Sequence, residues 1–274
     1  MTTILVPTDF SKCAENALHS AFVLAERTNA AIVVLHVVFP NEALDNNIYN
    51  AFWTEEYLQE RQQALRRWTE RIRQPVRFGQ VKTDVHCRVG FPVPSICEAA
   101  EELKADLIVM GTTGATGLRG AILGSVAAGV MAHTELPVLS IPKNRIFDLT
   151  VNAVLATDFR FDVSQATLNV LREVLADIKG KLHILHVMAQ PDAPRQVEKE
   201  QQLSALLHPV AHEFHYLHDR DIVQAAINFI EALDAGLLIA VAHRHSIFHR
   251  IFFDRTTRRL AHRAQVPLLT LHDM

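Results

Sequence analysis

The stretch from residue 107 to residue 142, LIVMGTTGATGLRGAILGSVAAGVMAHTELPVLSIP, decides how this chain folds. A short apolar run enters a glycine-rich loop, and Ser125 then opens an Ala- and Val-rich segment. This order predicts a strand, a loop and a helix. Glycine allows positive φ and a close approach to main-chain N–H groups, and a helix N-terminus adds unpaired donors. Such an arrangement suits a phosphate group.

A glycine-rich loop also occurs as a plain tight connection between a strand and a helix. No glycine here is followed by Lys-Ser or Lys-Thr, and no GxGxxG occurs, so the usual nucleotide motifs are absent. The spacing is instead Gly111-x2-Gly114-x9-Gly124-Ser125. Taken alone, the loop leaves phosphate binding and a purely structural turn open.

The composition describes a globular protein that can bury a core. The chain has 274 residues, of which 49% are hydrophobic, and its net charge is −3. This near-neutral charge argues against a nucleic-acid partner. No export signal or apolar run of about 18 residues is apparent, so we expect no membrane span. Three widely spaced cysteines predict no disulfide framework, which fits a cytoplasmic protein.

Strands and helices alternate along the first half of the chain. The expected strands are residues 4–6, 31–38, 81–89, 107–110 and 137–141. Expected helices follow from Ser11, from residue 58, from residue 94 and from Ser125. This alternation predicts a doubly wound parallel sheet with right-handed crossovers. A ligand would lie at the carboxyl ends of the strands, near a topological switch point.

The pattern begins again after Lys143. Three segments of the second half repeat the first in outline: residues 154–159, 182–187 and 266–271. Asp158 lies 149 positions after Asp9, and Pro267 lies 130 positions after Pro137. The second copy is therefore about 19 residues shorter, and the shortfall falls between its second and third strands. We predict two homologous domains, residues 1–145 and 146–274.

Pro7-Thr8-Asp9-Phe10 follows the first expected strand, His36-Val37 ends the second, and the glycine spacing follows the fourth. These separated motifs resemble the universal stress protein family in its tandem two-domain form. The resemblance implies two adenine nucleotide alpha hydrolase-like, Rossmann-like domains in tandem. It also implies a stress-response regulatory protein that binds ATP or another adenine nucleotide, with or without Mg²⁺.

In ATP-binding members of that family the matching positions surround one nucleotide. In this sequence they are Pro7, Thr8, Asp9, Val37, Met110, Gly111, Gly114, Arg119, Gly124, Ser125 and Val126. The resemblance places Asp9 on the ribose, Val37 on adenine, and Met110 with Gly111 against sugar and base. It places the glycine loop and the start of the following helix on the phosphates.

Each of these residues also has a plainer interpretation. Asp9 is equally at home as a helix cap or turn residue. Arg119 either reaches a terminal phosphate or is only solvated. His36, at the end of an apolar strand, is expected to be a hydrogen-bonded core residue without a catalytic role.

The second copy has lost its glycines. Of the 10 glycines in the chain, only Gly180 and Gly236 lie beyond residue 150. At an offset of 130, the positions of Gly111, Gly114, Gly124 and Ser125 become Val241, Arg244, Asp254 and Arg255. An aspartate at a helix start would repel phosphate. We therefore expect this domain to bind no ATP in the family manner and to serve a structural or partner-binding role.

The second copy also holds most of the 15 histidines, which raises the question of zinc. Those considered are His208, His212, His215, His218, His243, His245 and His249. They lack a tight two-ligand spacing on a helix and an accompanying cysteine, and residues 212, 215 and 218 would not share one strand face. No metal site is predicted.

Two other functions stay open at this point. One is slow ATP hydrolysis with Ser125 and a metal ion at the phosphates, although no general base or Walker B carboxylate is evident, so we predict no catalytic residue. The other is an interaction protein that binds no nucleotide. The closing strands, residues 137–141 and 266–271, are expected to pair, either within the chain as a pseudo-dimer or between chains as a homodimer.

Overall fold

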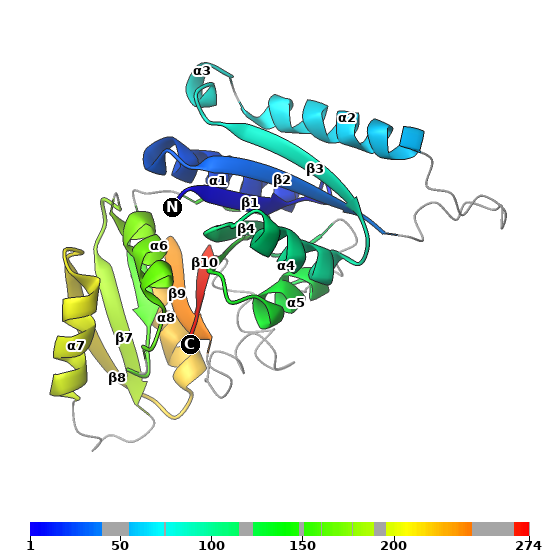
Figure 1. Cartoon of the computed structure of the whole chain (residues 1–274). Coiled ribbons are helices and arrows are strands. Elements are labelled where there is room, and N and C mark those ends of the chain that lie inside the picture. Colours follow the sequence, from blue (N-terminus) through cyan, green and yellow to red (C-terminus); the bar gives the residue numbers. More distant parts are fainter. Residues whose placement is uncertain are drawn as a thin grey trace.

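Ten strands form one continuous sheet with helices on both faces (Figure 1). The strand order is β3-β2-β1-β4-β5-β10-β9-β6-β7-β8. The computed structural model describes residues 1–39, 55–73, 75–114, 123–147, 151–159, 161–176, 178–188, 196–242 and 266–273.

The first half runs in the expected alternation. Its elements are β1 (Thr3–Pro7), α1 (Lys12–Thr28), β2 (Ala31–Val38), α2 (Glu55–Arg73), α3 (Pro75–Phe78), β3 (Thr83–Val89), α4 (Pro92–Glu102), β4 (Leu107–Gly111), α5 (Ser125–His133) and β5 (Val138–Ile141). All five predicted strands are present, and among the described residues of this half the short helix α3 is the one element that the sequence did not predict. The α/β fold class is confirmed.

The second half repeats this layout. Its elements are β6 (Ala153–Ala156), α6 (Gln165–Leu175), β7 (Leu182–Met188), α7 (Val197–Leu207), β8 (His212–His218), α8 (Ile222–Ala232), β9 (Leu237–Ala242) and β10 (Leu268–His272). Leu5 is in register with Ile108, and the corresponding pair in the second half is Val154 with Leu238. These pairs lie at the offsets of 149 and 130 that the sequence repeat indicated.

Local sequence explains why these elements form. Strand β2 is a continuous apolar run rich in β-branched residues, as expected for a parallel strand covered on both faces. Helix α1 begins after Ser11, whose side chain accepts a hydrogen bond from the backbone N–H of Ala14 over 3.2 Å. Helix α4 begins with Pro92, at a position where a backbone N–H would have no acceptor within the helix, so proline is well tolerated.

Helices cover both faces of the sheet, which makes each half doubly wound. Helices α1, α2, α6 and α7 contribute to a hydrophobic core on one face, and this core includes buried residues from both halves. Helices α4 and α5 pack on the opposite face of the first half, and α8 packs on that face in the second half. Figure 1 shows α2 near the outer strand β3 and α7 near the outer strand β8.

The two halves join through their closing strands. Strand β5 pairs antiparallel with β10, with Leu139 opposite Leu269, while the strands within each half pair in parallel. This confirms that the closing strands can pair within one chain. A homodimer and the exact domain boundary stay predictions. Among the described helices, none combines the length and the hydropathy needed to cross a bilayer.

Candidate functional site

The candidate site lies where the order of the strands reverses. Strand β1 pairs with β2 on one side and with β4 on the other. The chain therefore leaves β1 toward one edge of the sheet and later returns to form β4 on the other side. Ligands of open α/β sheets bind at the carboxyl ends of strands at such a switch point. The turn after β1 and the glycine loop after β4 both lie there.

The turn after β1 is held by Thr8. Its Oγ1 accepts a hydrogen bond of 3.0 Å from the N–H of Phe10, which has a φ of 63°. Pro7 and Thr8 are buried, whereas Asp9 is exposed. One oxygen of Asp9, Oδ1, accepts from the N–H of Ser11 over 3.1 Å. The turn thus anchors itself with the threonine and presents the carboxylate at the surface.

His36 supports the same turn from β2. Its Nδ1 lies 2.8 Å from the carbonyl oxygen of Thr8, and its ring lies 4.6 Å from that of Phe10. Only 7% of His36 is exposed. The expectation of a hydrogen-bonded core histidine is confirmed.

The glycine loop begins with a close approach between β4 and α1. A Cβ atom on Gly111 would lie 2.9 Å from Cys13 Sγ and 3.0 Å from the Cys13 carbonyl carbon. The Cys13 thiol donates to the carbonyl oxygen of Ile141 over 3.1 Å. Cys13 was not among the residues expected at the site from the sequence. No sequence pattern indicated this contact, because it depends on how closely α1 approaches β4.

Gly114 lies directly beside Asp9. A Cβ atom on Gly114 would lie 2.7 Å from Asp9 Oδ2, closer than real Cβ contacts come. Glycine is therefore the residue that lets this loop meet the carboxylate without displacing it. This contact joins the two motifs that are more than 100 residues apart in the sequence.

The last residue of the glycine loop, Gly124, lies next to the first residues of the loop. The N–H of Gly124 donates to the carbonyl oxygen of Thr112 over 2.5 Å, and a Cβ atom on Gly124 would lie 3.7 Å from the nitrogen of Gly114. Gly124 is also the N-cap of α5, without a side-chain cap hydrogen bond, and Ser125 is exposed. The first turn of α5 holds no acidic residue, so no carboxylate of that turn would compete with an anion for its N–H groups.

An apolar patch adjoins these polar groups. Met110 is buried in the hydrophobic cluster that α4 and α5 share with the sheet, and Val37 and Val126 are half-buried against the same cluster. Val37 and Met110, the predicted contacts for base and sugar, therefore share one packed surface with Val126, a predicted phosphate contact. Arg119 lies outside the described residues.

The second half contains a copy of the turn. Thr157 Oγ1 accepts from the N–H of Phe159 over 2.8 Å, and Phe159 again has a φ of 63°. His186 Nδ1 lies 2.8 Å from the carbonyl oxygen of Thr157. Asp158 is half-buried at the position of Asp9. The turn therefore forms part of the fold in both halves and does not by itself mark a ligand site.

The halves differ at the carboxyl end of the strand next to the turn, which is β4 in the first half and β9 in the second. Val241, with 4% exposure, occupies the position of Gly111. Arg244, Asp254 and Arg255, which replace the other key residues, lie outside the described residues.

Comparisons with known proteins agree with this layout. A sequence model described as "Universal stress protein family" matches residues 1–142. A universal stress protein of Synechocystis sp. is 32% identical over 146 residues, covering 50% of this chain and 94% of that protein. One from Methanocaldococcus jannaschii is 35% identical over 142 residues, covering 51% of this chain and 81% of that protein.

A solved structure extends the likeness to the whole chain. The crystal structure of a universal stress protein from Archaeoglobus fulgidus aligns with a TM-score of 0.73 at 22% identity. The alignment covers 99% of this chain and 98% of that one. At this identity the likeness concerns the fold, and it includes both halves.

Proposed function

Because the chain belongs to the universal stress protein family, we propose that it is a stress-response regulatory protein whose N-terminal domain, residues 1–145, binds ATP or another adenine nucleotide. The nucleotide would lie across the carboxyl ends of β1, β2 and β4. The C-terminal domain would contribute structure or a surface for a partner.

The contact between Gly114 and Asp9 carries this proposal. A carboxylate is a suitable acceptor for ribose hydroxyl groups, and Gly114 brings the start of the glycine loop beside it. The gap of 2.7 Å between Asp9 Oδ2 and an added Cβ means that a larger residue at position 114 would push against the carboxylate. Gly114 thus keeps the start of the proposed phosphate-binding loop next to the carboxylate that would bind the sugar.

The start of α5 supplies the phosphate end of the proposed site. Its first N–H groups have no intrahelical acceptor, and the positive end of the helix dipole favours an anion. The exposed hydroxyl of Ser125 adds a donor in the same turn. Val37 and Met110 would supply apolar contacts for the base and the sugar.

Titrations with ATP, AMP and adenosine test these assignments separately. Asp9→Ala should weaken all three ligands, because all three carry the ribose. Ser125→Ala should weaken ATP and leave adenosine unchanged. Each lost hydrogen bond to a charged group is worth roughly 1.5–3 kcal/mol, or about tenfold to a hundredfold in affinity.

The outcome also distinguishes the alternatives. Wild-type protein that binds none of the three ligands would refute the proposal and leave a nucleotide-free interaction protein. Phosphate release from ATP well above a Ser125→Ala control would indicate a slow hydrolase.

A further inference from the structure

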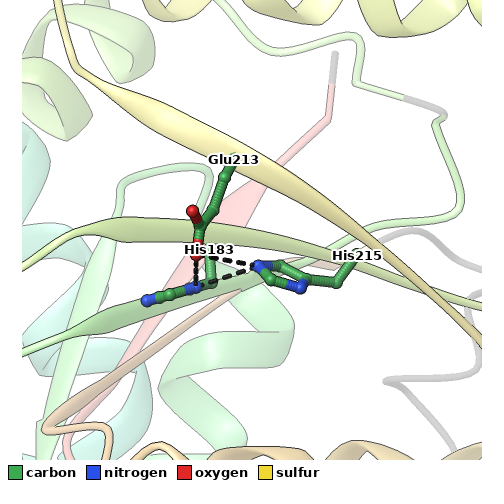
Figure 2. Close-up of side chains that lie close together, drawn as sticks. All are labelled: His183, Glu213 and His215. Carbon is green, nitrogen blue, oxygen red and sulfur yellow. Dashed lines mark hydrogen bonds and ion pairs between the residues drawn. The ribbon is translucent and has the colours of Figure 1, made fainter.

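Three potential metal ligands meet on one face of the second half, away from the proposed nucleotide site. His183 comes from β7, and Glu213 and His215 come from the neighbouring strand β8 (Figure 2). His183 Nδ1 lies 2.8 Å from Glu213 Oε1 and 3.0 Å from His215 Nε2. His215 Nε2 lies 3.2 Å from the same carboxylate oxygen. The three atoms form a nearly equilateral triangle.

Protons alone cannot satisfy all three sides of this triangle. The carboxylate oxygen only accepts, so each ring nitrogen would have to donate to it. The two nitrogens would then both be protonated 3.0 Å apart, with no acceptor between them. If either nitrogen is instead unprotonated, its lone pair faces the carboxylate oxygen. A cation removes the conflict, because all three atoms can offer lone pairs to it.

We propose that His183, Glu213 and His215 bind a divalent transition-metal ion, with Zn²⁺ the best fit and water in a fourth position. Two imidazole nitrogens and one carboxylate oxygen form a set that zinc accepts, and three protein ligands plus water is a common zinc coordination. The site is independent of the proposed nucleotide binding.

The dimensions of the triangle agree with this ion. Zinc lies about 2.0–2.2 Å from nitrogen and oxygen ligands, and a tetrahedron of that size has ligands roughly 3.3 Å apart. The observed sides of 2.8, 3.0 and 3.2 Å need to expand by only a few tenths of an ångström.

The surroundings suit a metal site. His183 is 5% exposed, and the ring of Phe229 on α8 lies 4.9 Å from that of His215 and 6.3 Å from that of His183. Lys181 Nζ lies 3.4 Å from the second carboxylate oxygen, Glu213 Oε2, which leaves Oε1 facing the nitrogens. The Lys181 side chain is largely exposed, so solvent screens its charge. Burial on one side and solvent on the other leave room for a water ligand.

Protonation states also favour metal binding. Burial lowers the pKa of His183; Glu213 opposes this effect, and His215 and Lys181 add to it. The neutral imidazole is the form that binds metal. Partial burial raises the pKa of Glu213, but Lys181 and His183 outweigh this and leave it lowered, so the carboxylate is ionised at neutral pH.

A zinc titration of the full-length, chelator-treated protein tests the proposal. Calorimetry should show one high-affinity ion per chain. His215→Ala and Glu213→Gln should each weaken binding by at least about tenfold, since loss even of an outer-shell partner costs that much. At the same zinc concentration, the melting temperature of the wild type should rise more than that of either variant.

His218→Ala is the matched control, because His218 lies on the same strand, is exposed and takes no part in the triangle. It should bind zinc like the wild type. Absence of zinc binding by the wild type, or equal binding by the wild type and Glu213→Gln, would overturn the proposal. Equal loss in His218→Ala would overturn it as well. Glu213→Gln keeps the side-chain volume at a partly exposed position, so it decides the matter if His215→Ala does not fold.

Discussion

At position 114, a glycine leaves space for the carboxylate of Asp9 in the proposed ligand site. Gly114 is exposed, so it does not belong to the hydrophobic core. An added Cβ would instead meet the carboxylate of Asp9, at 2.7 Å. A larger residue at position 114 would therefore act mainly by displacing the Asp9 carboxylate. This effect can be measured as a change in ligand affinity.

Gly114→Ala should weaken ATP binding at least about tenfold, because the new methyl group would displace the Asp9 carboxylate. The free energy of unfolding should change little, because the Asp9 side chain can rotate away from the methyl group. Calorimetry and urea denaturation on the same preparation measure the two effects. In the Asp9→Ala background the added alanine should cost much less, as expected for coupled neighbours. Additive losses in the double variant would show that Gly114 acts without Asp9.

Gly111, at the start of the same loop, has a different role: it allows helix α1 to pack closely against strand β4. The neighbours of an added Cβ include the Cys13 carbonyl carbon at 3.0 Å and the Ala14 nitrogen at 3.1 Å. Both are backbone atoms of α1, so the whole helix would have to move away from β4. The loop thus begins with a glycine needed for packing and continues with one next to the proposed ligand.

Gly111→Ala should accordingly lower the free energy of unfolding by about 1–3 kcal/mol, the usual cost of overpacking. Urea denaturation of Gly111→Ala beside Gly114→Ala measures the contrast. The expected order is a large loss of stability for the first and a small one for the second. The reverse order would contradict the packing role given to Gly111.

Elements that depend on local patterns could be predicted from the sequence. The apolar run of β2 and the capping Ser11 located their elements closely, and the three motifs located the switch point. The triangle of His183, Glu213 and His215 could not be found this way, because it depends on the register of two parallel strands about 30 residues apart. The contact of Gly111 with Cys13 likewise depends on how closely a helix approaches a strand.

At the scale of the whole molecule, the junction of the halves carries a titratable group. His272 at the end of β10 has its Nε2 2.7 Å from the carbonyl oxygen of Met131 on α5. Burial lowers the pKa of His272, although the backbone hydrogen bonds and the nearby Asp273 and Glu135 oppose this effect. The folded protein therefore keeps His272 neutral to a lower pH than the unfolded chain does.

Because of His272, the free energy of unfolding should decrease as the pH is lowered. The unfolded chain protonates His272 near its ordinary pKa of about 6.5, whereas the folded chain resists protonation to lower pH. The contribution is therefore full above about pH 6.5 and is lost as the pH falls toward the lower folded value. His272→Gln keeps a donor without titrating, so it should lose less stability between about pH 7.5 and about pH 5.5 than the wild type. Parallel stability curves for the two proteins would exclude this role.

The duplicated turn makes the chain its own control. Thr157, Asp158 and Phe159 reproduce the turn of Thr8, Asp9 and Phe10, down to the φ of 63° and the histidine on the next strand. The sequence places glycines beside only the first of these turns. A fold-wide role for the aspartate would affect both copies alike, whereas a ligand role should affect one.

Calorimetric titration of ATP into the full chain, beside Asp9→Ala and Asp158→Ala, tests the central claim most directly. We expect one ATP per wild-type chain, binding at least about tenfold weaker in Asp9→Ala and unchanged binding in Asp158→Ala. Two equivalent sites per chain, or weakening by Asp158→Ala without weakening by Asp9→Ala, would contradict the account.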